Sequence, residues 1–425
     1  MNIFKNIPDN TANRISYWHL AAFLFFLPTD RYLSQLALIS FGMHTIIHLE
    51  RKSIRSLVTA ENGILASVWL LTLSGLLYTH DLHQGEKDLV IQAGLLVFPF
   101  VFSLTSLNLA RYRNRLLLFF AFCCTACVLY LFGDALLIIY YYGFPLKSLF
   151  SYSFINQNFS SPLAMHATYL SAFLALSISI LLNAWLHAFK QKNRWLYLVC
   201  ILILCAGLIQ LASRAVWVAL LIFQLTAFPF MAFEGKKRIK YFLVSFCITA
   251  FAVFLIAGTQ VFRERYIAEF RADLKKEPIN QQIPEPRMAR WEAAFELIRV
   301  SPITGYGSGS EKRLLKEKYY EKQLYTSYLL ELNTHNQYLA LWLKHGIAGL
   351  LVFLFTLGWG YYRAWRQKDI IFICFMLLVT VMSFSENILD VNKGVFFYGF
   401  FFALLVKSGK PLLKIYRSDK NAEIV

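Results

Sequence analysis

The sequence predicts an all-α, polytopic membrane protein with about twelve transmembrane helices and one large extracytoplasmic helical loop. Of its 425 residues, 57% are hydrophobic and only 16% are charged, whereas about 25% of the residues in a soluble domain are charged. The apolar residues form runs that are long enough to cross a bilayer, for which roughly 20 residues suffice per helix. This composition excludes a disordered chain, a collagen-like repeat and an ordinary soluble enzyme.

Twelve apolar runs give the predicted helices in chain order. They lie near 16–28, 32–48, 58–78, 89–107, 115–142, 166–189, 195–212, 213–233, 240–259, 346–364, 369–385 and 393–408. The first run ends at Pro28 without a small-residue cleavage site, which indicates an uncleaved membrane helix rather than a signal peptide. The predicted organisation is an N-terminal bundle of about nine helices at 1–259, an extracytoplasmic loop at 260–345, C-terminal helices at 346–410 and a cytoplasmic tail at 411–425.

Basic residues sort to one side of this predicted topology. With the N-terminus placed in the cytoplasm, the inside segments hold 23 Lys and Arg residues. The short outside loops hold only Arg31, Lys87, Lys147, Arg214 and Lys393. This positive-inside bias and the even helix number place both termini in the cytoplasm and the long loop outside. The net charge of +17 therefore reflects topology, and we expect no nucleic-acid partner.

The seven cysteines all lie inside apolar runs, and none has a Cys or His partner at zinc spacing on a loop. Cys124 and Cys127 form a C-x2-C pair, but they lie within lipid-facing sequence, where packing is the expected role. We therefore expect no disulfide and no bound metal.

The loop 260–345 is the only soluble-like part of the chain, with 14 basic and 11 acidic residues. Its sequence predicts a polar helix at 263–277, a break at 281–286, an amphipathic helix from Pro286 and a further helix at 312–333. The amphipathic helix is expected to carry Met288, Trp291, Phe295 and Ile298 on one face. Between the last two helices, the glycine-rich segment 301–310 either offers backbone N–H groups to an anion or is a turn that folds the loop over the site.

One motif at the end of this loop is a candidate for chemistry. On a helix with about 100° per residue, four residues fall within roughly 60° of one another, namely His335, Trp342, Gly346 and Gly349. The imidazole would lie at the water end, and the glycines would permit close helix contact. The spacing alone fits equally well a chance surface histidine followed by a pair of packing glycines.

The stretch from His335 also fits the pattern H-[NSQ]-x9-G-x2-[GTY], with Asn336, Gly346 and Gly349 at the required places. At the end of a large outer loop in a chain of about twelve helices, it resembles the signature of the O-antigen ligase and polymerase family (the WaaL/Wzy-type ligase domain). The layout is similar along the whole chain, and the residue-level match lies at about 200–350. The resemblance implies a GT-C-like membrane fold and a glycosyltransferase in the bacterial inner membrane, with its active site facing the periplasm.

Two arginine sites fit the resemblance. Arg214 interrupts apolar sequence at the outer end of two adjacent predicted helices, where an arginine needs a partner or a role. It either snorkels as an anchor or clamps an anion, since guanidinium binds phosphate bidentately. The S/T-R-x-x-W/L segment of similar family members favours the clamp. Arg290, with Arg287 as the alternative, fits the family pattern R-x-x-x-W/A…P-x-x-G-x-G, which implies a second phosphate-binding arginine rather than a solvated helix face.

Further candidates lie on the predicted outer side. Asn336 and Trp342 in the motif are predicted to contact substrate. Glu386 either orients His335, balances an arginine or belongs to a solvated turn. His166, at the outer start of a helix, either touches substrate or has no role beyond that position.

These residues suggest a mechanism that needs no metal and no cofactor. Arg214 and Arg290 would bind the pyrophosphate of an undecaprenyl-pyrophosphate-linked glycan donor, whose lipid tail lies in the bilayer, and would offset charge on the leaving group. His335 would take the proton from an acceptor hydroxyl, on lipid A–core or on a glycan, as this hydroxyl attacks the anomeric carbon. Direct displacement predicts inversion at that carbon, because the sequence offers no obvious nucleophilic carboxylate.

The leading hypothesis is an O-antigen ligase that moves a lipid-linked glycan to lipid A–core. An O-antigen or exopolysaccharide polymerase and a protein O-oligosaccharyltransferase share the catalytic layout, so the sequence separates them poorly. The modest outer loop disfavours the protein-directed enzyme. A membrane transporter is the alternative from a different class, and the lack of a recognisable inverted repeat disfavours it.

Overall fold

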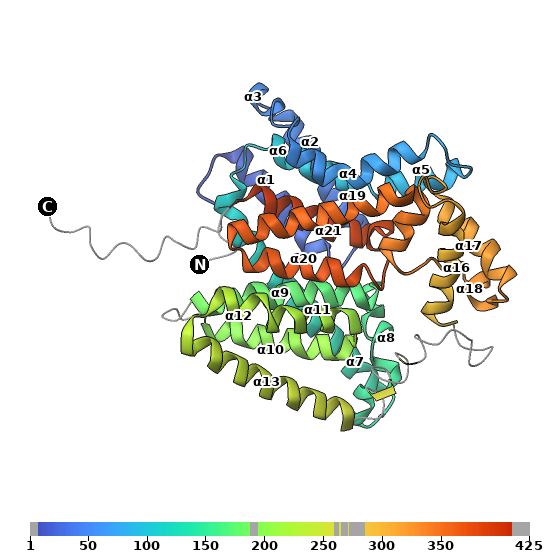
Figure 1. The fold of residues 1–425 in the computed structure, drawn as a ribbon. Helices are drawn as coiled ribbons and strands as arrows, with labels where there is room; N and C mark the ends of the chain where they lie inside the picture. The colour runs from blue at the N-terminus through green and yellow to red at the C-terminus, as the bar shows by residue number, and fades with distance from the viewer. Residues whose placement is uncertain (1–6, 188–193, 259–262, 265–270, 272–284, 410–425) are drawn as a thin grey trace.

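The computed structural model describes residues 7–187, 194–258, 263–264, 271 and 285–409. These residues form helices and the turns that connect them, with no strand among them. Figure 1 shows a bundle of long helices with a group of shorter helices at one end. The predicted all-α class is confirmed for this part of the chain.

The helices follow one another along the chain as the apolar runs predicted. The first half contains α1 (Thr11–Phe26), α2 (Arg31–Ile47), α3 (Arg51–Ile54), α4 (Ala60–Gly75), α5 (Leu82–Ile91), α6 (Gly94–Leu104), α7 (Leu109–Tyr141), α8 (Gln157–Ser160), α9 (Ala167–His187) and α10 (Arg194–Leu211). The second half contains α11 (Arg214–Leu225), α12 (Ala227–Ala232), α13 (Gly235–Gly258), α16 (Arg287–Val300), α17 (Ser310–Glu321), α18 (Tyr325–Leu329), α19 (Gln337–Gln367), α20 (Ile370–Met382) and α21 (Asn392–Lys407). Each predicted span falls on one of these helices or on two consecutive ones.

Six helical stretches among the described residues are long and apolar enough to cross a membrane. They are Leu82–Leu104, Leu109–Tyr141, Ala167–His187, Arg194–Leu211, Arg214–Ala232 and Gln337–Gln367. These stretches support the expected multi-pass membrane protein. Several other predicted spans are shorter helices, such as α1 and α4 with 16 residues each, so the total of twelve transmembrane helices remains a prediction.

Side-chain caps explain where several helices begin. The capping residues are Asn10, Asp30, Thr59, Asn108 and Asp369, directly before α1, α2, α4, α7 and α20. Each side chain accepts a hydrogen bond from the backbone N–H three residues further on. Such a cap satisfies an N–H group that the helix leaves without a partner and is worth about 1 kcal/mol. Polar residues between apolar runs therefore set the helix starts.

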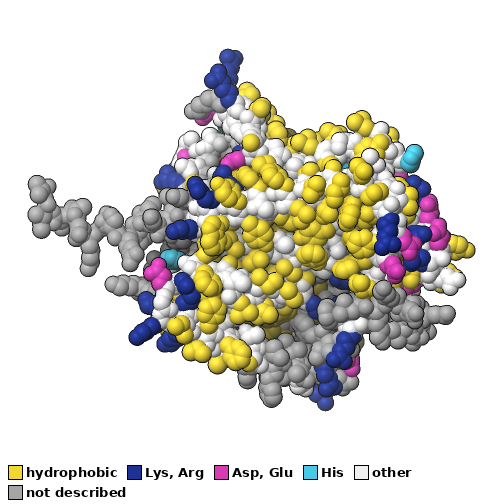
Figure 2. Space-filling view, viewed as in Figure 1, with side chains coloured by type: hydrophobic (Ala, Val, Ile, Leu, Met, Phe, Trp, Pro, Cys, Tyr) yellow, Lys and Arg dark blue, Asp and Glu magenta, His cyan; other side chains and the backbone are white. Residues whose placement is uncertain are grey.

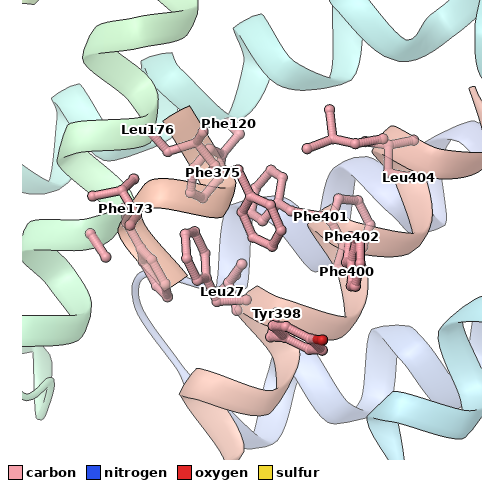
Figure 3. Close-up of a cluster of buried hydrophobic side chains, with 14 of the residues drawn as sticks. Leu27, Phe120, Phe173, Leu176, Phe375, Tyr398, Phe400, Phe401, Phe402 and Leu404 are labelled. Carbon is pink, nitrogen blue, oxygen red and sulfur yellow. The ribbon is translucent and has the colours of Figure 1, made fainter. Parts of the chain in front are cut away.

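The core of the bundle surrounds α21, whose residues from Lys393 to Val406 are all buried. Aromatic rings fill the space between α21 and its neighbours (Figure 3). The ring of Phe401 lies 4.9 Å from that of Phe120 in α7 and 6.3 Å from that of Phe375 in α20, measured between centroids. These contacts join the two halves of the chain in one apolar core.

Contacts between helix ends show which ends of the helices lie together on each side of the bundle. At one end, which we call the site end, Lys393 at the start of α21 donates to the Leu27 carbonyl after α1, with an N–O distance of 2.6 Å. At the opposite end, Arg113 in α7 pairs with Asp369 before α20, with an N–O distance of 2.5 Å. Figure 2 shows Lys and Arg gathered along the left edge of the molecule, at the opposite end, and hydrophobic side chains across the face between the two ends.

Candidate functional site

His335 lies at the site end, directly before α19. Asn336 caps this helix, since its side chain accepts from the N–H groups of Tyr338 and Leu339 at 3.0 and 3.2 Å. The backbone of His335 is left-handed, with φ of 46°, a conformation that a non-glycine residue keeps only when its surroundings impose it. The interpretation that placed His335 on a helical face with Trp342 is therefore wrong, because the cap separates His335 from the helix.

Glu386, in the turn between α20 and α21, is the hydrogen-bond partner of His335. The distance from His335 Nδ1 to Glu386 Oε2 is 3.4 Å, and the two side chains are 27% and 9% exposed. The other carboxylate oxygen accepts from the Thr168 hydroxyl, at the start of α9, at 3.3 Å. Since Nδ1 faces the carboxylate, the second ring nitrogen, Nε2, is left to meet a ligand.

Burial and neighbouring charges set the ionisation of this pair. Burial has the largest effect and lowers the pKa of His335, Glu386 raises it, and the charges of Arg290 and Arg287 lower it, so that the pKa lies below its ordinary value. Burial would raise the pKa of Glu386, but its contact with His335 and the charges of His166 and Arg287 hold that pKa below its ordinary value. At neutral pH, the pair is therefore a neutral imidazole beside an ionised carboxylate.

Helix α16 carries Arg287 and Arg290 and begins after Pro286, as the sequence predicts. Its buried residues are Ala289, Arg290, Ala293, Ala294 and Ile298. Of the predicted stripe, Ile298 is buried and Trp291 is half-buried, whereas Phe295 is 40% exposed. The small alanines pack against α17 and α19 together with Ile298 and Trp291, so the stripe forms only part of the buried face.

This packing turns Arg290 inward. Its side chain is only 6% exposed, and its charge acts on both His335 and Tyr319 of α17. Next to it, the indole Nε1 of Trp291 donates to the Thr334 carbonyl at 2.9 Å, which attaches α16 to the residue before His335. Arg290 is thus an interior cation near the imidazole and not part of a solvated helix face.

His166 and Arg214 lie at the same end of the bundle. The Thr168 N–H donates to His166 Nδ1 at 3.4 Å, which places this exposed histidine beside the Thr168–Glu386 contact. Arg214 is the first residue of α11. The preceding helix, α10, ends near Asn156, whose N–H donates to the Gln210 carbonyl at 2.9 Å. The structure therefore brings His166, Glu386, His335 and both α16 arginines together and places Arg214 at the site end on a separate helix.

A buried carboxylate that the sequence analysis missed ties the His335 and Glu386 segments together. Glu311, in the first turn of α17, accepts from the N–H and hydroxyl groups of Thr334 at 3.0 and 2.9 Å and from the Asn387 amide at 3.0 Å. Thr334 precedes His335, and Asn387 follows Glu386. Glu311 therefore fixes the two halves of the pair relative to each other, although no sequence pattern marks it.

Lys344 in α19 is a second buried group that the sequence analysis missed. Its Nζ donates to both carboxylate oxygens of Asp390 at 2.9 and 3.0 Å and lies 3.9 Å from Glu311 and 4.0 Å from Asp88. A lysine inside an apolar helix requires acidic partners. That charge within the apolar run after His335 is the signal that identifies Lys344.

The glycine-rich segment 301–310 is a turn whose N–H groups bind partners within the protein, including the Asp88 carboxylate at Gly309. The Gly307 N–H donates to the Lys344 carbonyl at 2.8 Å, and the Ser308 N–H donates to the Gly75 carbonyl at 3.2 Å. Because these N–H groups are engaged, the segment acts as a strap between α4 and α19. Trp342 of α19 binds this strap, since its indole Nε1 donates to the Pro302 carbonyl at 3.1 Å.

The strap depends on a kink in α19 at His345 and Gly346. Gly346 has a φ of 62°, and a Cβ added to it would overlap the Ile303 carbonyl oxygen. Only glycine fits there without moving the strap. Within the described part of the chain, no group of three or more His, Cys, Asp or Glu residues is arranged to hold a metal ion.

Residues 199–354 match the family model Wzy_C, described as O-Antigen ligase. No match was found among curated proteins. The matched stretch runs from α10 into α19 and contains Arg214, Arg290 and His335, but neither His166 nor Glu386. This match confirms the resemblance to the O-antigen ligase and polymerase family. The catalytic and binding roles of the individual residues remain predictions.

Proposed function

We propose that the protein is a glycosyltransferase of the O-antigen ligase type. It would move a glycan from undecaprenyl pyrophosphate to a hydroxyl of lipid A–core at the periplasmic face of the bacterial inner membrane. The observation that supports this most directly is the His335–Glu386 pair, which lies within range of two arginine charges at the end of a long membrane bundle. The family match over 199–354 supports the reaction class.

In this proposal His335 is the general base. Its Nε2 takes the proton of the acceptor hydroxyl as that oxygen forms a bond to the anomeric carbon, and the bond from that carbon to the pyrophosphate oxygen breaks. Glu386 stabilises the imidazolium that forms, as a carboxylate does when it holds a catalytic histidine. Such a base contributes about 10²- to 10⁴-fold to the rate.

The arginines would bind the leaving group. Arg290 and Arg214 would pair with the pyrophosphate oxygens, with Arg287 beside them at the start of α16. Guanidinium groups offset the negative charge that grows on undecaprenyl pyrophosphate, so the mechanism requires no divalent metal. Asn336 fixes the backbone next to the base, and His166 lies where the acceptor would approach Glu386.

An acceptor assay in EDTA tests this function. Purified protein, lipid-pyrophosphate-linked glycan and lipid A–core are mixed, and the mobility of the core is followed on a gel. Transfer is expected in the wild type, with a loss of at least about 100-fold in His335→Ala, Arg290→Ala and Arg214→Ala. Arg299→Ala, at an exposed position of the same helix α16, is the control and should retain transfer.

The other outcomes identify the alternatives. Lengthening of the donor glycan with unchanged core would indicate a polymerase. Transfer to a Ser- or Thr-containing peptide would indicate a protein-directed enzyme. Movement of the lipid-linked glycan across the membrane without any transfer would indicate a transporter. Full activity in His335→Ala would contradict the assignment of the base.

A further inference from the structure

Asp134 is a carboxylate within membrane-spanning helix α7, outside the candidate catalytic site. This 33-residue helix is about 50 Å long, whereas the hydrocarbon core of a bilayer is about 30 Å thick. From Arg115 to Asp134 the helix rises about 28 Å. If Arg115 lies at the headgroup boundary of the opposite end, Asp134 lies at the headgroup boundary of the site end.

Asp134 lines a pocket of about 200 Å³ between α7 and the segment 153–162. The other polar residues that line it are Ser153, Asn158 and Ser161. The rest of the lining is apolar and includes Ile138, which is 37% exposed on the surface of α7. The pocket thus combines a carboxylate with apolar walls.

Among the polar groups that line the pocket, several hydrogen-bond acceptors have no partner among the described residues, whereas some of the donors are already engaged. The Asn158 side-chain amide already donates to the Tyr152 carbonyl at 2.9 Å, and the Ser161 hydroxyl donates to the Asn158 carbonyl at 2.8 Å. The Asp134 carboxylate forms no hydrogen bond or ion pair with the residues that the structure describes. An ionisable group at such a position in a membrane helix points to a ligand or partner, and this lining suits a ligand that is cationic and carries N–H donors.

We propose that this pocket binds the primary ammonium headgroup of a phospholipid, phosphatidylethanolamine. An ammonium group has one positive charge and three N–H donors, which suit the carboxylate and the free acceptors of Asn158 and Ser161. The acyl chains would lie along the exposed apolar side of α7, where Leu137 is 68% exposed. Beyond the pocket, the exposed Tyr140–Tyr142 segment supplies aromatic side chains that favour the membrane interface.

Lipid titrations followed by native mass spectrometry test this site independently of glycan transfer. The purified full chain in detergent is titrated with phosphatidylethanolamine, phosphatidylcholine or phosphatidylglycerol of identical acyl chains. Phosphatidylcholine is the sharpest control, because its quaternary ammonium is cationic but has no N–H donor. We expect the first phosphatidylethanolamine to bind about tenfold more tightly than phosphatidylcholine, the effect of roughly one charge-assisted hydrogen bond.

The variant Asp134→Asn should abolish this preference and leave binding of the other two lipids unchanged. Glu317→Gln, which removes an exposed carboxylate from α17, should keep the preference. Equal binding of phosphatidylethanolamine and phosphatidylcholine by the wild type would overturn the proposal, and so would a preference that survives in Asp134→Asn. Competition by putrescine at the lipid's own concentration would overturn the lipid assignment in favour of a soluble amine.

Discussion

Glu386 raises the pKa of His335, the proposed general base, and so sets how strong a base it would be. Burial lowers the pKa of His335, and the contact with Glu386 opposes this effect. Because the base must be neutral to accept a proton, the rate of transfer should fall as the pH decreases through a midpoint below the ordinary histidine pKa of about 6.5. A pH profile of initial rates therefore reports directly on this pair.

Glu386→Gln should weaken the base. Glutamine keeps a hydrogen-bond acceptor near Nδ1 but removes the charge that raises the pKa of His335, so the acid limb of the pH profile should move to lower pH. We expect kcat to fall about 10- to 100-fold, since the imidazolium loses its counter-charge. Initial rates of glycan transfer from about pH 4.5 to 8 provide the measurement. An unchanged limb would show that Glu386 does not act on the base.

Glu311 acts on the His335–Glu386 pair through Thr334 and Asn387. Exchanging the hydrogen-bond donor and acceptor between Glu311 and Asn387 tests this role. In Glu311→Gln, the new oxygen can still accept from Thr334, but the new amide then faces the Asn387 amide. Asn387 cannot turn over, since its Oδ1 accepts the Asn336 N–H at 2.8 Å. We expect kcat to fall about tenfold, the effect of one lost buried hydrogen bond, with little change in KM for the donor.

The double variant Glu311→Gln/Asn387→Asp restores donor and acceptor between these two positions and should recover part of the activity, because it still loses the bond from Asn387 to Asp390 at 3.2 Å. The pH dependence of His335 modification by diethyl pyrocarbonate gives a readout that needs no transfer activity. If the segment around Thr334 loosens, the His335 imidazole becomes more exposed. The pKa of His335 should then rise towards its ordinary value in the single variant and fall back to its wild-type value in the double variant. A double variant as impaired as the single one would argue for a general loss of packing.

At the scale of the helix, the strap can pack against α19 only because Gly346 has no side chain. Gly346→Ala places a methyl group against the Ile303 carbonyl at a residue with φ of 62°, so we expect a loss of stability of about 1–3 kcal/mol. Gly358 lies in the same helix with open space around its Cα. Gly358→Ala should leave stability unchanged or raise it by up to about 1 kcal/mol. Thermal unfolding of both variants in detergent makes the comparison, and equal midpoints would contradict this role of the kink.

The elements show what the sequence could and could not predict. Runs of apolar residues predicted every long helix, because burial in lipid or protein needs only composition and length. The placement of His335 on a helix was wrong, because the cap at Asn336 separates it from α19. The buried face of α16 was predicted only in part, because three small alanines that hydrophobic periodicity does not mark belong to it. His335 and Arg290 follow from a family motif. Glu311 and Lys344 do not, since their importance arises from contacts between segments that are distant in the chain.

At the scale of the whole molecule, the pair of Arg113 and Asp369 joins the two halves of the chain at the end opposite the site. Arg113 lies between the predicted spans 89–107 and 115–142 and is therefore one of the 23 inside basic residues that indicate the topology. The structure instead buries it, with exposures of 1% for Arg113 and 2% for Asp369. This pair therefore locks α7 to the start of α20, in addition to any effect on topology.

Arg113→Ala should consequently destabilise the protein by about 3–5 kcal/mol, because it leaves a buried carboxylate without its counter-charge. Asp369 also caps α20 through the Phe372 N–H at 3.1 Å, so the matched double variant is Arg113→Met/Asp369→Asn, which keeps a cap and removes both charges. The double variant should be clearly more stable than Arg113→Ala, as measured by thermal unfolding in detergent. Glycan transfer at temperatures where the variants stay folded should be unaffected, since the pair lies far from His335. If Arg113→Ala instead unfolds like the wild type but inserts in mixed orientations, the residue serves topology alone and the structural lock is refuted.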